Sequence, residues 1–142
     1  MMDGVSEDLA ILYRAVSRRQ GRVDYAGCIT AGEALRLMQS GLARLVDVCT
    51  GPDPGRSQLE SHLPSGALAV ALPPSSSGSP VHDFGEALGA LAAATETLLF
   101  IAGSAEDSHA AATLAARAGF YCALQVLDER ERYLALRDAV MA

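Results

Sequence analysis

The sequence predicts an α/β protein whose central, mostly parallel five-stranded sheet is covered by helices on both faces. Two observations support this prediction. Short apolar runs alternate along the chain with segments whose apolar residues recur at helical spacing. The run Leu45–Cys49 is also mostly apolar, as expected for a strand buried on both faces of a parallel sheet. Because crossovers between parallel strands are right-handed, this order of elements predicts a doubly wound sheet.

The first half of the chain is expected to supply two helices together with several strands. The strands are expected at 27–29, 45–49 and 67–72. One helix is capped by Ser6 and runs to Arg19, with its apolar residues on one stripe. The next begins at Thr30, which forms a capping box with Glu33, and ends at Gly41.

The second half is expected to continue the same alternation. Strands are expected at 97–102 and 121–127, with a tight loop at 103–107. A capping box of Asp83 and Glu86 indicates the start of one helix. A helix rich in small residues should run from Ser108 to Ala118, and Asp128 should cap the last helix.

Composition and charge exclude several classes of protein. The chain has 142 residues, 50% hydrophobic and only 20% charged, which fits one folded domain rather than a disordered chain. Its net charge of −6 argues against nucleic acid or an anionic membrane as a partner. No apolar run approaches the roughly 20 residues of a membrane-spanning helix. The first helical segment carries Glu7, Asp8 and Arg14, which a signal peptide would not.

The cysteines and the basic residues narrow the expected chemistry further. Three cysteines, an odd number, do not make a disulfide framework, so we expect reduced thiols in the cytoplasm. No motif requires a metal or cofactor, and none is expected. Between Arg56 and Arg117 the chain has no basic residue other than histidine. An anion site built from this stretch would therefore depend on backbone amides or on histidines.

Four segments of the chain carry a resemblance to a known family. They are Leu45–Val48, His62–Pro64 with Gly66–Ala67, Leu98–Phe100, and Ser108–Ala112 with Gly119–Phe120. In this order and spacing, they make the chain from Asp24 to Leu127 similar to the rhodanese-like domains. The resemblance implies a rhodanese-like domain at 24–142, preceded by an N-terminal helical extension at 1–23. It also implies sulfur transfer by a loop cysteine that loop amides, a helix N-terminus and an arginine activate.

The loop that should carry this chemistry is degenerate. It reads Ala102, Gly103, Ser104, Ala105, Glu106, Asp107 and Ser108. Ala102 occupies the position of the family's cysteine, and Asp107 occupies that of its arginine. Glu106 and Asp107 place negative charge where a persulfide or a phosphate would need positive charge. Further departures from the family's pattern are Cys49, Arg56, Ser65 and Asp128–Glu129.

Three functional hypotheses follow from this combination. The first is a rhodanese-like module that has lost sulfurtransferase activity and binds or regulates a protein or small molecule. The second is an active sulfurtransferase in which Cys49, at the end of a predicted core strand, is the displaced persulfide carrier. The third is a subunit whose active partner is another chain. If the first helix does not cover the sheet, its apolar stripe suggests a homodimer.

Other catalytic combinations are weak. Ser104, Ser108, His109 and Asp107 could suggest a hydrolase, but neighbours on one helical turn point apart, and the chain has no Gly-x-Ser-x-Gly motif. The histidines, which are His62, His82 and His109, lack the paired spacing of metal ligands. Cys28 and Cys122 lie in or beside apolar runs, so we expect both thiols in the core.

Overall fold

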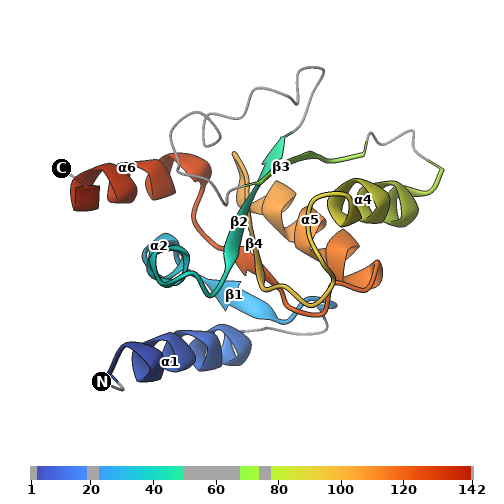
Figure 1. The fold of residues 1–142 in the computed structure, drawn as a ribbon. Coiled ribbons are helices and arrows are strands. Elements are labelled where there is room, and N and C mark those ends of the chain that lie inside the picture. Colours follow the sequence, from blue (N-terminus) through green and yellow to red (C-terminus); the bar gives the residue numbers. More distant parts are fainter. Residues whose placement is uncertain (1–2, 19–22, 50–67, 74–77, 142) are drawn as a thin grey trace.

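The protein is described by a computed structural model that covers residues 3–18, 23–49, 68–73 and 78–141. Its centre is a five-stranded sheet in the order β1-β5-β4-β2-β3 (Figure 1). The strands are β1 (Gly27–Ile29), β2 (Arg44–Cys49), β3 (Leu68–Ala71), β4 (Leu98–Ile101) and β5 (Ala123–Val126). Every pairing within the sheet is parallel. The predicted α/β class and parallel sheet are therefore confirmed.

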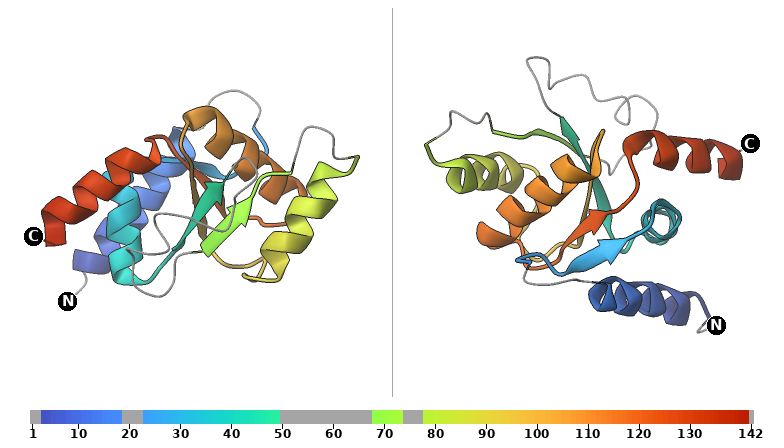
Figure 2. Two further views of the ribbon diagram at one scale, coloured as in Figure 1. Left: turned by 90° about the horizontal axis from the view of Figure 1, so that it is seen from above. Right: turned by 180° about the vertical axis from the view of Figure 1, so that it is seen from behind.

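Helices cover both faces of this sheet, as predicted (Figure 2). The described helices are α1 (Asp3–Ser17), α2 (Ala31–Ser40), α4 (Pro80–Gly89), α5 (Ala105–Arg117) and α6 (Arg130–Met141). On one face, α4 and α5 pack against alternate strand residues such as Val46 and Phe100. On the other face, α1, α2 and α6 pack against Leu45 and Leu99. Because each strand is buried on both sides, its sequence is almost continuously apolar.

Local sequence signals placed α2 correctly. The Thr30 side chain accepts a hydrogen bond from the backbone of Glu33, and the Glu33 side chain accepts one from the backbone of Thr30. At the other end, Gly41 adopts a left-handed conformation with φ of 77° and closes the helix. Both signals lie within the helix and its caps, so they require no tertiary information.

Two helix starts differ from the prediction. Helix α1 begins at Asp3, so Ser6 lies inside it rather than capping it. Helix α4 begins at Pro80, and Asp83 lies in its first turn, so Asp83 and Glu86 do not form the expected capping box. Proline suits the first position of a helix because its φ is already helical and its missing N–H needs no acceptor there. That preference decided the start of α4.

Asp128 also has a role that the sequence did not reveal. Its carboxylate accepts a hydrogen bond of 2.6 Å from the backbone N–H of Ala31, at the start of α2. The last helix begins at Arg130, where the N–H groups of Arg132 and Tyr133 point to the carbonyl of Glu129. Asp128, which was predicted to cap α6, thus caps α2 through a tertiary contact. Its negative charge stabilises the positive end of the α2 dipole.

Helix α1 is packed closely onto the edge strand β1. Ile11 and Ala15 are buried in the core that α1 shares with α2 and α6. A Cβ atom built on Gly27 of β1 would lie only 2.3 Å from the carbonyl oxygen of Ala15, so glycine alone permits this approach. The N-terminal helix therefore covers the sheet.

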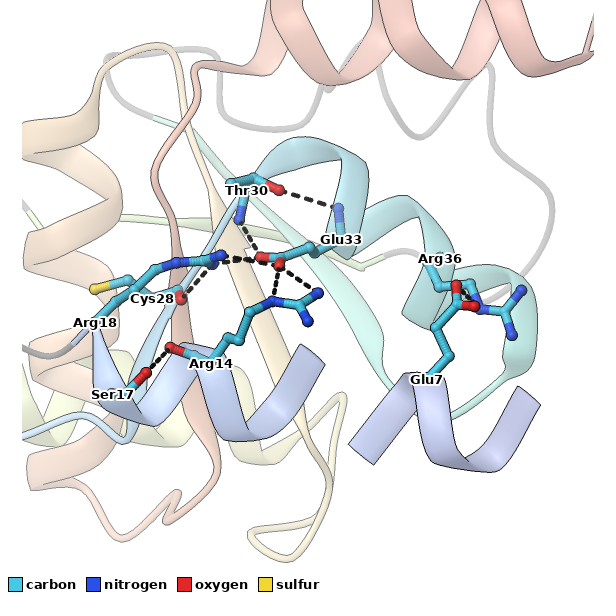
Figure 3. Close-up of polar contacts among 8 residues, drawn as sticks. All are labelled: Glu7, Arg14, Ser17, Arg18, Cys28, Thr30, Glu33 and Arg36. Atoms are coloured by element: carbon cyan, nitrogen blue, oxygen red, sulfur yellow. Dashed lines mark hydrogen bonds and ion pairs between the residues drawn. The ribbon is translucent and has the colours of Figure 1, made fainter. Parts of the chain in front are cut away.

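A cluster of charges around Glu33 fixes α1 to α2 (Figure 3). The Glu33 carboxylate accepts hydrogen bonds from Arg14 Nε at 3.1 Å, Arg18 Nη2 at 3.0 Å and the Thr30 backbone at 3.1 Å. Burial alone would raise the pKa of Glu33, but the donors from Arg18, Thr30 and Arg14 outweigh it and lower the pKa to about 2. The ionised carboxylate is thus the form that the fold stabilises.

This pKa predicts an acid-sensitive contribution to stability. Since the pKa of Glu33 is lower in the folded state, its stabilisation is complete above the unfolded pKa of about 4.3. It is lost as the pH falls toward the folded value of about 2. We expect Glu33→Gln to lower the free energy of unfolding by on the order of 2 kcal/mol at pH 7, with a smaller difference near pH 3. Urea unfolding across this range measures it, and a pH-independent difference would contradict the prediction.

Candidate functional site

The strand order identifies the edge of the sheet where ligands of such folds bind. From β2 the chain continues to β3 on one side, and from β4 it continues to β5 on the other. The carboxyl ends of these adjacent strands, where Asp47 pairs with Ile101, form the topological switch point. Because β2 and β4 are adjacent and parallel, Cys49, the last residue of β2, and Ala102, the residue after β4, lie at this same edge.

The connection from β4 to α5 is shorter than predicted. Helix α5 begins at Ala105, and Ser104 is its N-cap, with a side chain that accepts a 3.2 Å hydrogen bond from the Asp107 backbone. The expected loop over 103–107 and the helix start at Ser108 are therefore wrong. Ser104 has the free N–H groups of the first turn in reach, whereas Ser108 lies one turn further along. Glu106 and Asp107 consequently belong to the first turn of α5.

Ser108 is buried and has a structural role. Its side chain is fully buried, and its hydroxyl lies 3.0 Å from the carbonyl of Ala105 and 3.3 Å from that of Val126. His109, the next residue, contacts Tyr25 instead, with 2.7 Å between Nδ1 and the phenol oxygen. The serine and the histidine thus have different partners, as expected for sequence neighbours on one helix. They do not assemble a hydrolase triad.

Ala102 directly follows β4 and is buried. It is 1% exposed, and its carbonyl accepts a 2.8 Å hydrogen bond from the backbone of Arg130. Cys49 is the last residue of β2, and its backbone is paired with Ala71 of β3. The orientation of the Cys49 side chain lies outside the described part of the structure. So do His62 and the other departures at Arg56 and Ser65.

An ion pair that sequence reasoning missed lies at this edge. The carboxylate of Asp47 is 1% exposed and accepts a 2.7 Å hydrogen bond from Arg130 Nε. Arg130 Nη2 also donates to the carbonyl of Val48 at 3.0 Å, and Nη1 lies 3.5 Å from a Cβ built on Gly103. A carboxylate within a core strand requires a cationic partner, but the sequence does not say which arginine provides it.

The charges of the described residues at the switch point do not favour anions. The segment between Arg56 and Arg117 has no arginine or lysine of its own, and Arg130 places a positive charge beside it. The carboxylate of Asp47 compensates this charge. Glu106 is exposed and Asp107 half-buried at the start of α5, where two carboxylates complement the helix dipole. The N-terminus of α5 is therefore already matched by the negative charges of its own residues.

The other candidate ligands are dispersed. Within residues 3–18, 23–49, 68–73 and 78–141, no cluster of three metal-ligating side chains forms. His82 is exposed and lies 3.1 Å from Glu86 on its own helix. Cys28 is buried, as predicted. Cys122 is exposed, which corrects the expectation that it lies in the core, because β5 begins only at Ala123.

The outer face of α1 is apolar although its inner face already packs on the core. Leu9, Tyr13 and Val16 are 57%, 82% and 54% exposed. With Leu12 they line a surface groove of about 550 Å³. A helix with one apolar face toward the core and a second toward solvent presents a surface on which another chain can dock.

Comparison with models of known protein families and with curated proteins finds no match to this chain. In the part of the chain that is described, no helix combines the length and the apolar character needed to cross a membrane.

The ion pair between Asp47 and Arg130 predicts an unequal effect of two arginine substitutions. Arg130→Gln should lower the free energy of unfolding by about 2–4 kcal/mol, because the buried carboxylate loses this cation. Arg117→Gln is the matched control, since it removes a pair with Asp24 in which both side chains are about half exposed. It should cost about 0–1 kcal/mol. Urea unfolding at neutral pH measures both, and equal effects would contradict the prediction.

Proposed function

We propose that this chain is a rhodanese-like module that binds or regulates a partner and has no sulfurtransferase activity of its own. The support is the residue that directly follows β4. At the switch point of the sheet, where the proposed family would carry its cysteine, the chain has a buried alanine, Ala102. Glu106 and Asp107 follow it in the first turn of α5. A thiolate or a persulfide needs a nucleophile and a positive field, and neither is present in these residues.

A cytoplasmic location belongs to the same proposal. The described cysteines, Cys28 and Cys122, are free thiols, which agrees with a reducing compartment. The alternative function, sulfur transfer through Cys49, is kept because β2 ends at Cys49, beside β4 at the switch point. The two functions differ in an activity that can be measured directly.

We expect no transfer of sulfur from thiosulfate to cyanide above background. The measurement compares the wild type with Cys49→Ser and with Cys122→Ser, which removes an exposed thiol away from the switch point. In each case the assay follows thiocyanate formation. Turnover that survives in Cys122→Ser but disappears in Cys49→Ser would replace the proposed function by the alternative.

We further propose that the outer face of α1 is the partner surface and that a second copy of the chain occupies it. The four apolar residues of this face are symmetric about the midpoint between Leu12 and Tyr13. Two antiparallel copies of α1 would therefore place Leu9 of one copy against Val16 of the other, and Leu12 against Tyr13. Such self-complementarity is what a twofold interface requires. One helix face covers less than the roughly 800 Å² per partner of a standard interface, so the dimer should be weak.

This proposal predicts that the molar mass from light scattering rises toward that of a dimer as the protein concentration increases. Tyr13→Arg should keep the chain monomeric without affecting folding, because the Tyr13 side chain is 82% exposed. Tyr121→Arg is the matched control, a similarly exposed tyrosine at 78% on another surface, and it should dimerise like the wild type. A wild type that stays monomeric would refute the dimer but not the absence of sulfur transfer.

A further inference from the structure

A second pocket lies at the β1 edge of the sheet, opposite the edge formed by β3. It has a volume of about 480 Å³ and is bounded by the end of α1, the edge strand β1, the end of β5 and the first half of α5. Polar side chains form one part of its wall, and Val23 and Leu127 form an apolar part. None of the residues proposed for the switch-point site lines it.

A chain of hydrogen bonds fixes the polar part of the wall. The side-chain nitrogen of Gln125 donates to the carbonyl of Ala105 at 3.0 Å and to Ser108 Oγ at 3.2 Å. Its oxygen must therefore face the other way, where it accepts from the Tyr25 hydroxyl at 3.0 Å and from the Cys28 thiol at 3.7 Å. All the hydrogen-bonding capacity of this buried amide is used, so it acts as a rigid support.

This support sets the orientation of His109. Because the Tyr25 hydroxyl donates to Gln125, it can accept from Nδ1 of His109, which lies 2.7 Å away. The ring then presents its other nitrogen, Nε2, which has no hydrogen-bond partner among the described residues. His109 is exposed on α5 and lines the pocket. One polar atom of the wall is thus available to a ligand.

The charges at the mouth of the pocket leave a positive excess. Arg14 and Arg18 both bind the carboxylate of Glu33, so two cations share one anion (Figure 3). Arg18 also donates from Nη1 to the carbonyl of Cys28 and lines the pocket, and none of the described residues of the lining carries a carboxylate. The neighbouring Asp24 is compensated by Arg117 at 2.7 Å. In a protein with a net charge of −6, this local excess is a distinguishing feature.

From this geometry we propose that the pocket binds a small monocarboxylate with an apolar body. The carboxylate would lie against Arg18, and the apolar body would pack on Val23 and Leu127. With its proton on Nδ1, His109 offers Nε2 only as an acceptor, so it takes no part in binding the carboxylate. An arginine that is already held by Glu33 loses little further freedom when it binds a ligand, which favours affinity. This site is distinct from the switch point and does not depend on the proposed function.

Cys28 provides a direct probe of occupancy, because its thiol lines the pocket whereas Cys122 lies outside it. The experiment alkylates the full-length protein at alkaline pH, since burial raises the pKa of the Cys28 thiol. Peptide mass spectrometry then gives the labelling rate of each cysteine. Benzoate at about ten times its Kd should slow labelling of Cys28 roughly tenfold and leave Cys122 unchanged.

Two matched compounds separate the parts of the proposal. Benzamide has the same shape without the charge, and inorganic phosphate has the charge without the apolar body. Both should protect Cys28 much less than benzoate does. Equal protection by benzamide would overturn the role of charge, and equal protection by phosphate would overturn the role of the apolar wall. No protection by benzoate, together with no heat of binding in calorimetry, would overturn the site.

Variants then locate the charge that is recognised. Arg18→Gln should weaken benzoate binding by roughly tenfold, as expected for the loss of one charge-assisted hydrogen bond. Arg44→Gln, which removes a pair with Glu96 outside the pocket lining, should leave binding unchanged. Because Arg18 also holds α1, circular dichroism must show that the variant is folded. If it is not, the comparison of compounds on the wild type remains decisive. Unchanged binding in folded Arg18→Gln would overturn the proposal.

Discussion

The arrangement of the N-terminal part of the protein depends on the hydrogen bonds and ion pairs of the Glu33 carboxylate. It completes the capping box of α2 and at the same time binds Arg14 of α1 and Arg18, which directly follows α1. Through Arg18, which donates to the carbonyl of Cys28, it also reaches the edge strand β1. One charged group thus joins two helices and a strand. Its ionised form is stabilised because several donors surround it, which outweighs the cost of its burial.

The same principle organises the opposite part of the sheet. Asp47 lies within a core strand, where an unpaired carboxylate would be costly, and Arg130 provides the compensating charge. In consequence Arg130, which lies at the switch point, is committed to the fold. Arg14 and Arg18 differ, because they share one carboxylate and leave a positive excess beside a pocket. The balance of charge, rather than the number of arginines, therefore distinguishes the two regions.

Predictions from local sequence succeeded where a signal and its effect lie within a few residues of each other. The capping box of Thr30 and Glu33, the end of α2 at Gly41, and the apolar strands are of this kind. They failed where two local signals competed. Ser104 rather than Ser108 caps α5, and Pro80 rather than Asp83 begins α4. In both cases two plausible starts lie within about one turn, and the difference between them is on the order of 1 kcal/mol.

The sequence by itself determined the α/β class, the parallel sheet and the alanine that follows β4, because these follow from periodicity and from residue identity. Only the tertiary structure decided which group each buried polar side chain meets. Asp47 and Arg130 are 83 residues apart, Tyr25 and His109 are 84 apart, and Asp128 caps a helix 97 residues before it. Such pairs leave no local pattern, since a buried charge or amide needs a partner of the right chemistry but not at any fixed distance along the chain.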